Sequence, residues 1–134
     1  MHPDIRFCLT QCRTIAVVGL SPKPHRDSHR IAQYMQAHGY RIVGVNPATK
    51  EVLGEPCYPS LSEAAAHERI DLVNCFRNAE DIPPIVTEAM VVGAKAVWMQ
   101  LGIAHASAAA QARAAGLVVV EDRCLKVEHA ALDR

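Results

Sequence analysis

The chain has 134 residues, and its fourteen basic and fourteen acidic side chains give a formal net charge of zero. This length fits one domain over residues 1–134 that buries a core without disulfide support. The charge balance argues against a protein that coats nucleic acid, and no apolar run approaches the ~20 residues of a membrane span.

The amino-terminal segment and the cysteines indicate the compartment. Residues 1–12 lack the basic start and the long apolar run of a signal peptide. The five cysteines, at positions 8, 12, 57, 75 and 124, form an odd set without a C-x-x-C pair, which suits reduced thiols. We therefore expect a cytoplasmic protein.

Strands are expected to alternate with helices along the chain. After a helix over residues 3–12, short runs rich in valine and isoleucine predict buried strands at 14–20, 40–46, 70–76, 94–100 and 116–121. Apolar spacing, a capping box and an alanine-rich run predict helices around 31–38, 60–68, 82–90 and 105–116. Because short crossovers join the strands, the sequence predicts an α/β fold, a Rossmann-like three-layer sandwich with a parallel sheet of about five strands.

The segment after the first strand begins like a nucleotide-binding turn. Gly19 stands where a G-x-G-x-x-G loop would start, but the second and third glycines of that fingerprint are absent. Lys23 and Arg26 bring positive charge, and Ser28 is expected to be the N-cap of the next helix, whose amino terminus would suit a phosphate. On the alternative interpretation, Gly19, Ser21 and Ser28 only make a turn and a cap.

The segment after the second strand bears on the choice of nucleotide. An NAD-binding domain places an acidic residue there to hold the ribose, but no Asp or Glu occurs between Ser28 and Lys50. The strand ends instead in Asn46 and Pro47. This neutral to basic end is compatible with NADP or coenzyme A, both of which carry an extra phosphate near the ribose.

Six blocks of sequence carry a family resemblance. They are GLSPKPHRDSHRIAQYM, GYRIVGVNP, LGEPCYPSL, IDLVNCFR, AKAVWMQLGI and EDRCLKVEH, which follow one another between residue 14 and about residue 130. In this order they resemble the small stand-alone bacterial CoA-binding proteins, which are related to the N-terminal domain of the succinyl-CoA synthetase alpha subunit. The resemblance implies a Rossmann-type domain that binds coenzyme A at its strand ends.

The resemblance also assigns site residues, block by block. On the phosphate side it implies Gly19, Leu20, Ser21, Lys23, Arg26 and Ser28. Around the adenosine it implies Val45, Asn46, Pro47 and Lys50, followed by Cys75, Phe76 and Arg77 after the third strand, and Gln100 and Gly102 after the fourth. The helix start at residues 105–111 is less acidic than the family pattern, which leaves the pantetheine side open.

Three functions remain open from sequence. The first is a non-catalytic carrier, sensor or regulatory module for coenzyme A or an acyl-CoA, since the catalytic parts of succinyl-CoA synthetase lie outside the matched domain. The second is an NADP-dependent oxidoreductase, for which the later loops offer only His105 and Lys126 as proton donors. The third is an interaction subunit with an empty pocket. No catalytic residue, metal site, nucleic-acid partner or membrane partner is expected, while the thiols of Cys75 and Cys124 fall at strand ends near the expected site.

Overall fold

One parallel sheet forms the centre of the computed structural model, which describes residues 1–132. Every strand that the sequence predicts is present and parallel to its neighbours, although each is shorter than its apolar run. These strands are Thr14–Val18 (β1), Arg41–Val45 (β2), Leu72–Cys75 (β5), Ala96–Met99 (β6) and Val118–Val120 (β7).

The prediction of about five strands needs a correction, because the described sheet has seven, in the order β3-β4-β2-β1-β5-β6-β7. Glu55–Tyr58 (β4) runs parallel to β2. Glu51–Val52 (β3) pairs antiparallel with β4 and forms the edge of the sheet. These strands are too short for a periodic signal, and a proline within β4 reads against a strand.

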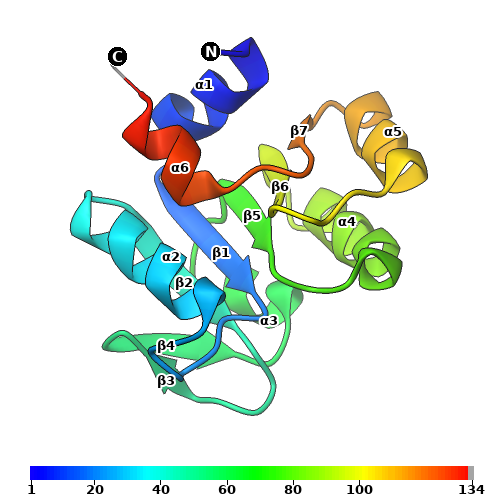
Figure 1. The fold of residues 1–134 in the computed structure, drawn as a ribbon. Helices are drawn as coiled ribbons and strands as arrows, with labels where there is room; N and C mark the ends of the chain where they lie inside the picture. Colours follow the sequence, from blue (N-terminus) through cyan, green and yellow to red (C-terminus); the bar gives the residue numbers. More distant parts are fainter. Residues whose placement is uncertain (133–134) are drawn as a thin grey trace.

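Helices cover both faces of the sheet (Figure 1), which confirms the three-layer sandwich. One face carries Pro3–Gln11 (α1), Asp27–Ala37 (α2) and Leu125–Ala130 (α6), and the other carries Leu61–Ala65 (α3), Ile82–Val91 (α4) and Ala106–Ala114 (α5), with a 3₁₀ turn at Ala79–Asp81 before α4. Alternate strand residues supply two cores: Ile15 and Val17 face α1, α2 and α6, whereas Ala16 and Val18 face the other layer. None of the helices within residues 1–132 is long and apolar enough to cross a membrane.

Side-chain caps start three helices of the described chain, from His2 at α1, Ser60 at α3 and His105 at α5. The Ser60 hydroxyl accepts from the Glu63 amide at 3.1 Å, as the capping-box spacing predicts. The expected cap at Ser28 is wrong, because α2 starts at Asp27, two residues earlier than a cap at Ser28 requires, and Arg26 occupies the N-cap position without a side-chain bond. An acidic residue in the first turn suits the positive end of the helix dipole.

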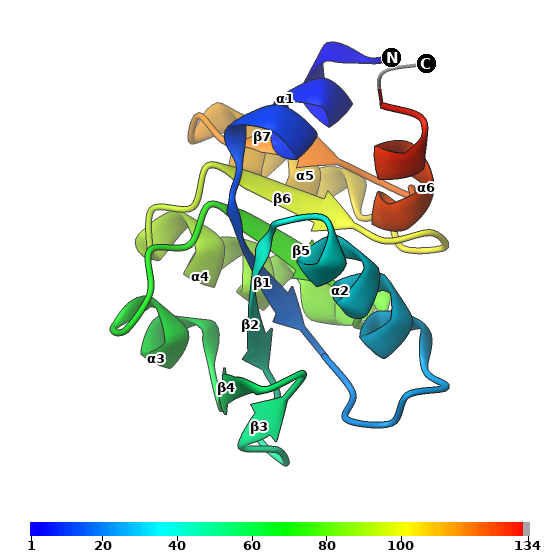
Figure 2. The ribbon, with the colours of Figure 1, turned by 90° about the vertical axis from the view of Figure 1, so that its left-hand side faces the viewer.

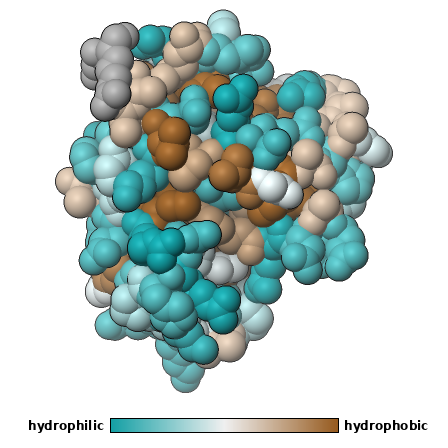
Figure 3. Space-filling view, viewed as in Figure 1, coloured by the Kyte–Doolittle hydropathy of each residue, from teal (hydrophilic) through white to brown (hydrophobic). Residues whose placement is uncertain are grey.

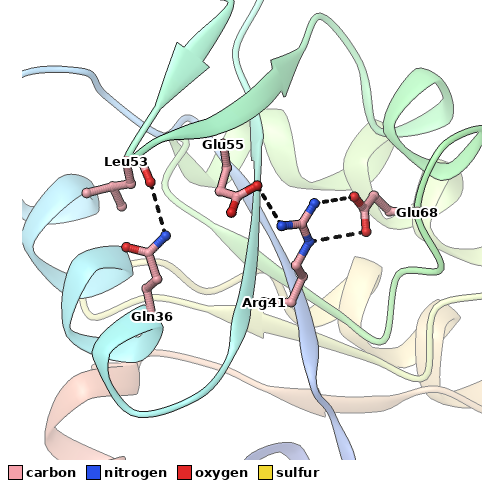
Figure 4. Close-up of polar contacts among 5 residues, drawn as sticks. All are labelled: Gln36, Arg41, Leu53, Glu55 and Glu68. Atoms are coloured by element: carbon pink, nitrogen blue, oxygen red, sulfur yellow. Dashed lines mark hydrogen bonds and ion pairs between the residues drawn. The ribbon is translucent and has the colours of Figure 1, made fainter.

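Polar and charged side chains hold the amino ends of the strands together, at the edge of the sheet opposite the carboxyl ends of the strands. Arg41 donates to Glu55 at 2.6 Å and to Glu68 at 2.5 Å, and Gln36 donates to the Leu53 carbonyl of the hairpin at 3.1 Å (Figure 4). The hydrogen bond from Arg41 lowers the pKa of Glu68. This network attaches the β3–β4 hairpin to the parallel sheet.

Candidate functional site

The strand order reverses at β1, which lies between β2 and β5. Ligands of doubly wound sheets bind beyond the carboxyl ends of the strands at such a reversal. In Figure 2 the strand arrows point to the right, and that side of the molecule is the one that faces the viewer in Figure 1. The face seen in Figure 1 therefore carries the carboxyl ends of the strands. The candidate site is therefore built from the loops on this face.

Gly19 brings two of these loops together. Its amide donates to the Val45 carbonyl at 2.9 Å, and its φ of 92° lies in a region that favours glycine. A Cβ at this position would lie 2.7 Å from the Phe76 carbonyl oxygen. The loop after β1 thus passes directly over the loop after β5, and only glycine permits this approach.

Side-chain bonds fix the loop over residues 19–28. The Ser21 amide donates to the Ser28 hydroxyl at 3.0 Å, and the Ser21 carbonyl lies 2.9 Å from Nδ1 of His29. Asn46 reaches across from the end of β2 and donates to the Leu20 carbonyl at 2.9 Å. Ser28 therefore joins the loop to the first turn of α2, a role different from the cap expected from sequence.

A hollow of about 360 Å³ opens above this loop. It is lined by Gly19, Ser21, Lys23, Arg26, Asp27, Ser28 and Phe76. The amides of the first α2 turn, from Asp27 to His29, have no acceptor within residues 1–132. Lys23 and Arg26 are exposed and form no ion pair with the described residues. Free amides and unpaired cations at a helix amino terminus form a site for an anion such as phosphate.

A second hollow, of about 540 Å³, adjoins the first and shares Asp27 and Phe76 with it. Its other lining residues are Arg30, Ile31, Arg77, Asn78, Ala79, Gln100, Leu101, Gly102, Ile103, Cys124 and Lys126. The two hollows thus combine into one groove, and its smaller part is the more polar of the two. Figure 3 shows apolar side chains gathered among hydrophilic ones on this face.

The floor of the larger hollow is held by the end of β6. Gln100 is 4% exposed, and its Oε1 accepts from the Leu125 amide at 3.0 Å. The Trp98 indole donates to the Arg123 carbonyl at 2.8 Å. These bonds fix residues 123–125, including Cys124, against the sheet.

The structure brings together many, but not all, of the residues implied by the resemblance. Nine line the groove: Gly19, Ser21, Lys23, Arg26, Ser28, Phe76, Arg77, Gln100 and Gly102. The others line neither hollow: Leu20, Val45, Asn46, Pro47, Lys50 and Cys75. Leu20, Val45 and Cys75 are buried, and burial raises the pKa of the Cys75 thiol to about 12.

Several lining residues carried no signal of their own in the sequence. Arg30 pairs with Asp27 on the same helix face, and Ile31 follows them toward the core. Cys124 and Lys126 belong to the block after the last strand, which sequence analysis placed near the rim without assigning them a contact. Of the proton donors weighed for an oxidoreductase, Lys126 lines the groove, whereas Nδ1 of His105 accepts from the Ala108 amide and caps α5.

No group of three or more His, Cys, Asp or Glu side chains that could hold a metal ion occurs in the described part of the chain. The groove thus presents amides, cations and apolar surface to a ligand.

Comparison with known proteins identifies the class to which this fold and groove belong. The family model described as "CoA binding domain" matches residues 13–130. The chain therefore belongs to the CoA binding domain family.

Three known proteins are similar to this chain. The chain is 39% identical over 127 residues to "Uncharacterized protein YneT" of Bacillus subtilis, with 95% of this chain and 93% of that protein covered. A solved structure of a hypothetical protein from Pyrococcus horikoshii superposes with a TM-score of 0.90 at 40% identity, covering 96% of this chain and 89% of the other. The chain is also 32% identical over 76 residues to an ADP-forming acetate–CoA ligase of Archaeoglobus fulgidus. This match covers 57% of this chain and 11% of the ligase.

Proposed function

We propose that the protein binds coenzyme A or an acyl-CoA along the groove, as a carrier, sensor or regulatory module without catalysis of its own. The observation that carries this proposal is the junction of the two hollows at Asp27 and Phe76. A diphosphate and a long, mostly uncharged arm ending in a thiol match a cationic hollow that continues into a larger, less polar one. Membership of the CoA binding domain family supports the same ligand.

The diphosphate is assigned to the smaller hollow. Lys23 and Arg26 supply charge there, and the leading amides of α2 supply donors. The adenosine then lies toward the end of β2, where Asn46 and Pro47 leave an uncharged surface and Lys50 is the nearest exposed cation along the chain. This assignment would account for the absence of an acidic residue at that strand end.

The arm of the ligand is assigned to the larger hollow. Gln100 offers its side-chain Nε2 there, for which no acceptor exists among residues 1–132. Amide or thioester carbonyls of the arm would accept from this group. The proposed compartment is the cytoplasm, where the five free cysteines would remain reduced.

Thermal unfolding with three ligands tests this proposal. A ligand that binds only the folded state at a tenfold excess over Kd adds about 1.4 kcal/mol, which raises Tm by roughly 3–6 °C in a domain of this size. We expect this shift with coenzyme A and none with NAD or NADP at equal concentration. A shift with NADP and none with coenzyme A would favour the oxidoreductase interpretation, and no shift with any of them would favour an interaction subunit.

A substitution at Gln100 tests the assignment of the arm. Gln100→Glu keeps an oxygen to accept from Leu125 but replaces the donor group with a second acceptor. We expect coenzyme A to bind about 2- to 12-fold more weakly, equal to the ~0.5–1.5 kcal/mol of one hydrogen bond. Adenosine 3′,5′-bisphosphate, which lacks the arm, is expected to bind the variant and the wild type equally in calorimetric titrations.

The matched control is Gln111→Glu, which makes the same change of charge at an exposed position on α5. It is expected to leave both affinities unchanged. Equal weakening of coenzyme A and the bisphosphate by Gln100→Glu would show that the side chain does not contact the arm.

A further inference from the structure

The five cysteines differ sharply in exposure. Cys8, Cys12, Cys57 and Cys75 are buried. Burial raises the pKa of each of these thiols, to about 11 for Cys12 and to about 12 for Cys75. Cys124 is partly exposed, and it lines the larger hollow. It is therefore the thiol that a bound molecule can reach.

The backbone around Cys124 is held in place. The neighbouring Arg123 carbonyl accepts from Trp98 at 2.8 Å, and the Leu125 amide on the other side donates to Gln100 at 3.0 Å. Arg123 also donates through its amide to the Met99 carbonyl at 3.3 Å. The position of the thiol relative to the groove is thus set by the end of β6 rather than by a free loop.

Gln100 supplies a second feature that points to a ligand beside this thiol. The side chain is 4% exposed and lines the hollow, and its Oε1 is occupied by Leu125. Its Nε2 has no acceptor among the residues that the structure describes. This nitrogen is not among the fully buried polar atoms without a partner, so it is open to the hollow, where an acceptor on a bound molecule can meet it. Because Leu125 follows Cys124 directly, that acceptor would lie close to the thiol.

We propose that Cys124 exchanges with the disulfide of coenzyme A, so that the groove captures the oxidised form of its ligand as a reversible mixed disulfide. This inference rests on the proposed function, because it requires the arm of coenzyme A to end in the larger hollow. Arg30 and Lys126 line the same hollow and attract the anionic ligand. The site would then respond to the redox state of the coenzyme A pool.

The exchange is balanced without a further reactant. The Cys124 thiolate attacks one sulfur of coenzyme A disulfide, a new S–S bond forms to that sulfur, and the old S–S bond breaks. One molecule of coenzyme A leaves as a thiolate and takes up a proton from water. A reducing thiol reverses the step by the same route.

Intact-mass measurement with two disulfide probes tests the proposal. We expect coenzyme A disulfide to add one coenzyme A moiety to the wild-type protein, with a rate that saturates as the probe concentration rises. Because binding places the disulfide beside the thiol, the rate at low probe concentration is expected to exceed that with glutathione disulfide by at least about tenfold. Reduced coenzyme A is expected to slow the reaction by competition, and dithiothreitol to remove the adduct.

Two variants identify the sulfur. Cys124→Ser is expected to lose the adduct and to fold, since serine is favoured at the N-cap position that Cys124 occupies in α6. The control Cys57→Ser removes a buried thiol and is expected to keep the adduct. Far-ultraviolet circular dichroism checks the fold of both variants.

The outcomes separate this inference from the proposed function. If reduced coenzyme A stabilises the wild type but its disulfide forms no adduct, or reacts no faster than glutathione disulfide, the exchange is overturned and the binding function stands. An adduct that persists in Cys124→Ser also overturns it. If reduced coenzyme A neither stabilises the protein nor slows the reaction, the proposed function fails together with the inference.

Discussion

Gly19→Ala is expected to lower the free energy of unfolding by about 2–4 kcal/mol, the largest effect of any single change considered for this protein. Two causes add. The φ of 92° strains any residue with a Cβ, and the new methyl group would lie 2.7 Å from the Phe76 carbonyl oxygen and 3.3 Å from its carbon. Since these atoms are backbone, the loops after β1 and β5 must separate. Urea unfolding monitored by circular dichroism measures the loss.

Gly39→Ala is the matched control for this prediction. Gly39 has a φ of 91°, but nothing lies within 4 Å of the position that its Cβ would occupy. We expect backbone strain alone to lower the free energy of unfolding of this variant, by about 1–2 kcal/mol. Its affinity for coenzyme A is expected to equal that of the wild type. Equal falls in the free energy of unfolding of Gly19→Ala and Gly39→Ala would show that the contact between the loops after β1 and β5 does not contribute to stability.

Arg26→Ala is expected to weaken coenzyme A binding by about 1.5–3 kcal/mol, which is roughly 10- to 150-fold in Kd. The side chain lines the smaller hollow and has no ion-pair partner in residues 1–132, so its charge is available to the diphosphate. Because the side chain is exposed, stability in the absence of ligand is expected to stay within about 0.5 kcal/mol of the wild type. Calorimetric titration measures the first quantity and urea unfolding the second.

Arg69→Ala provides the control for charge. Arg69 is exposed and precedes β5, at the amino ends of the strands and away from the groove. The Arg69→Ala substitution changes the net charge by the same amount as Arg26→Ala, but it is expected to leave the Kd for coenzyme A unchanged. If both variants bound more weakly to the same degree, the effect would reflect overall charge, and if neither did, the diphosphate would lie elsewhere.

The central part of the fold could be predicted because buried parallel strands leave continuous apolar runs in the sequence. The runs at 14–20, 40–46 and 70–76 each contain the strand found there. The edge hairpin could not be predicted in this way, because β3 has two residues and β4 four, and neither has a periodicity to detect. Helix α6 was missed for a similar reason, since its six residues span less than two turns.

The candidate site was predicted better by segment than by residue. The strand-end rule and the family blocks located the loops after β1, β5 and β6, which do line the groove. They did not give side-chain direction. Leu20, Val45 and Cys75 stand at strand ends but turn into the core, because alternate residues of a strand face opposite sides and no pattern in a single segment says which side holds the ligand.

Ser28 and Cys124 show two further limits. Ser28 was expected as a cap from its residue type, yet the helix starts two residues earlier, and the Ser28 hydroxyl accepts from the Ser21 amide instead. Cys124 meets Ile31 and Phe76 in the groove from distant parts of the chain, so their proximity depends on how α6 packs beside α2. Tertiary packing of this kind leaves no local trace in the sequence.

Crystals of the protein grown with coenzyme A would show, through the difference electron density of the ligand, whether the coenzyme occupies the groove in the proposed direction. We expect diphosphate density beside Lys23, Arg26 and the first turn of α2, and arm density that passes Phe76 and ends near Cys124. Clear ligand density outside both hollows, or an arm directed away from Gln100, would contradict the proposal.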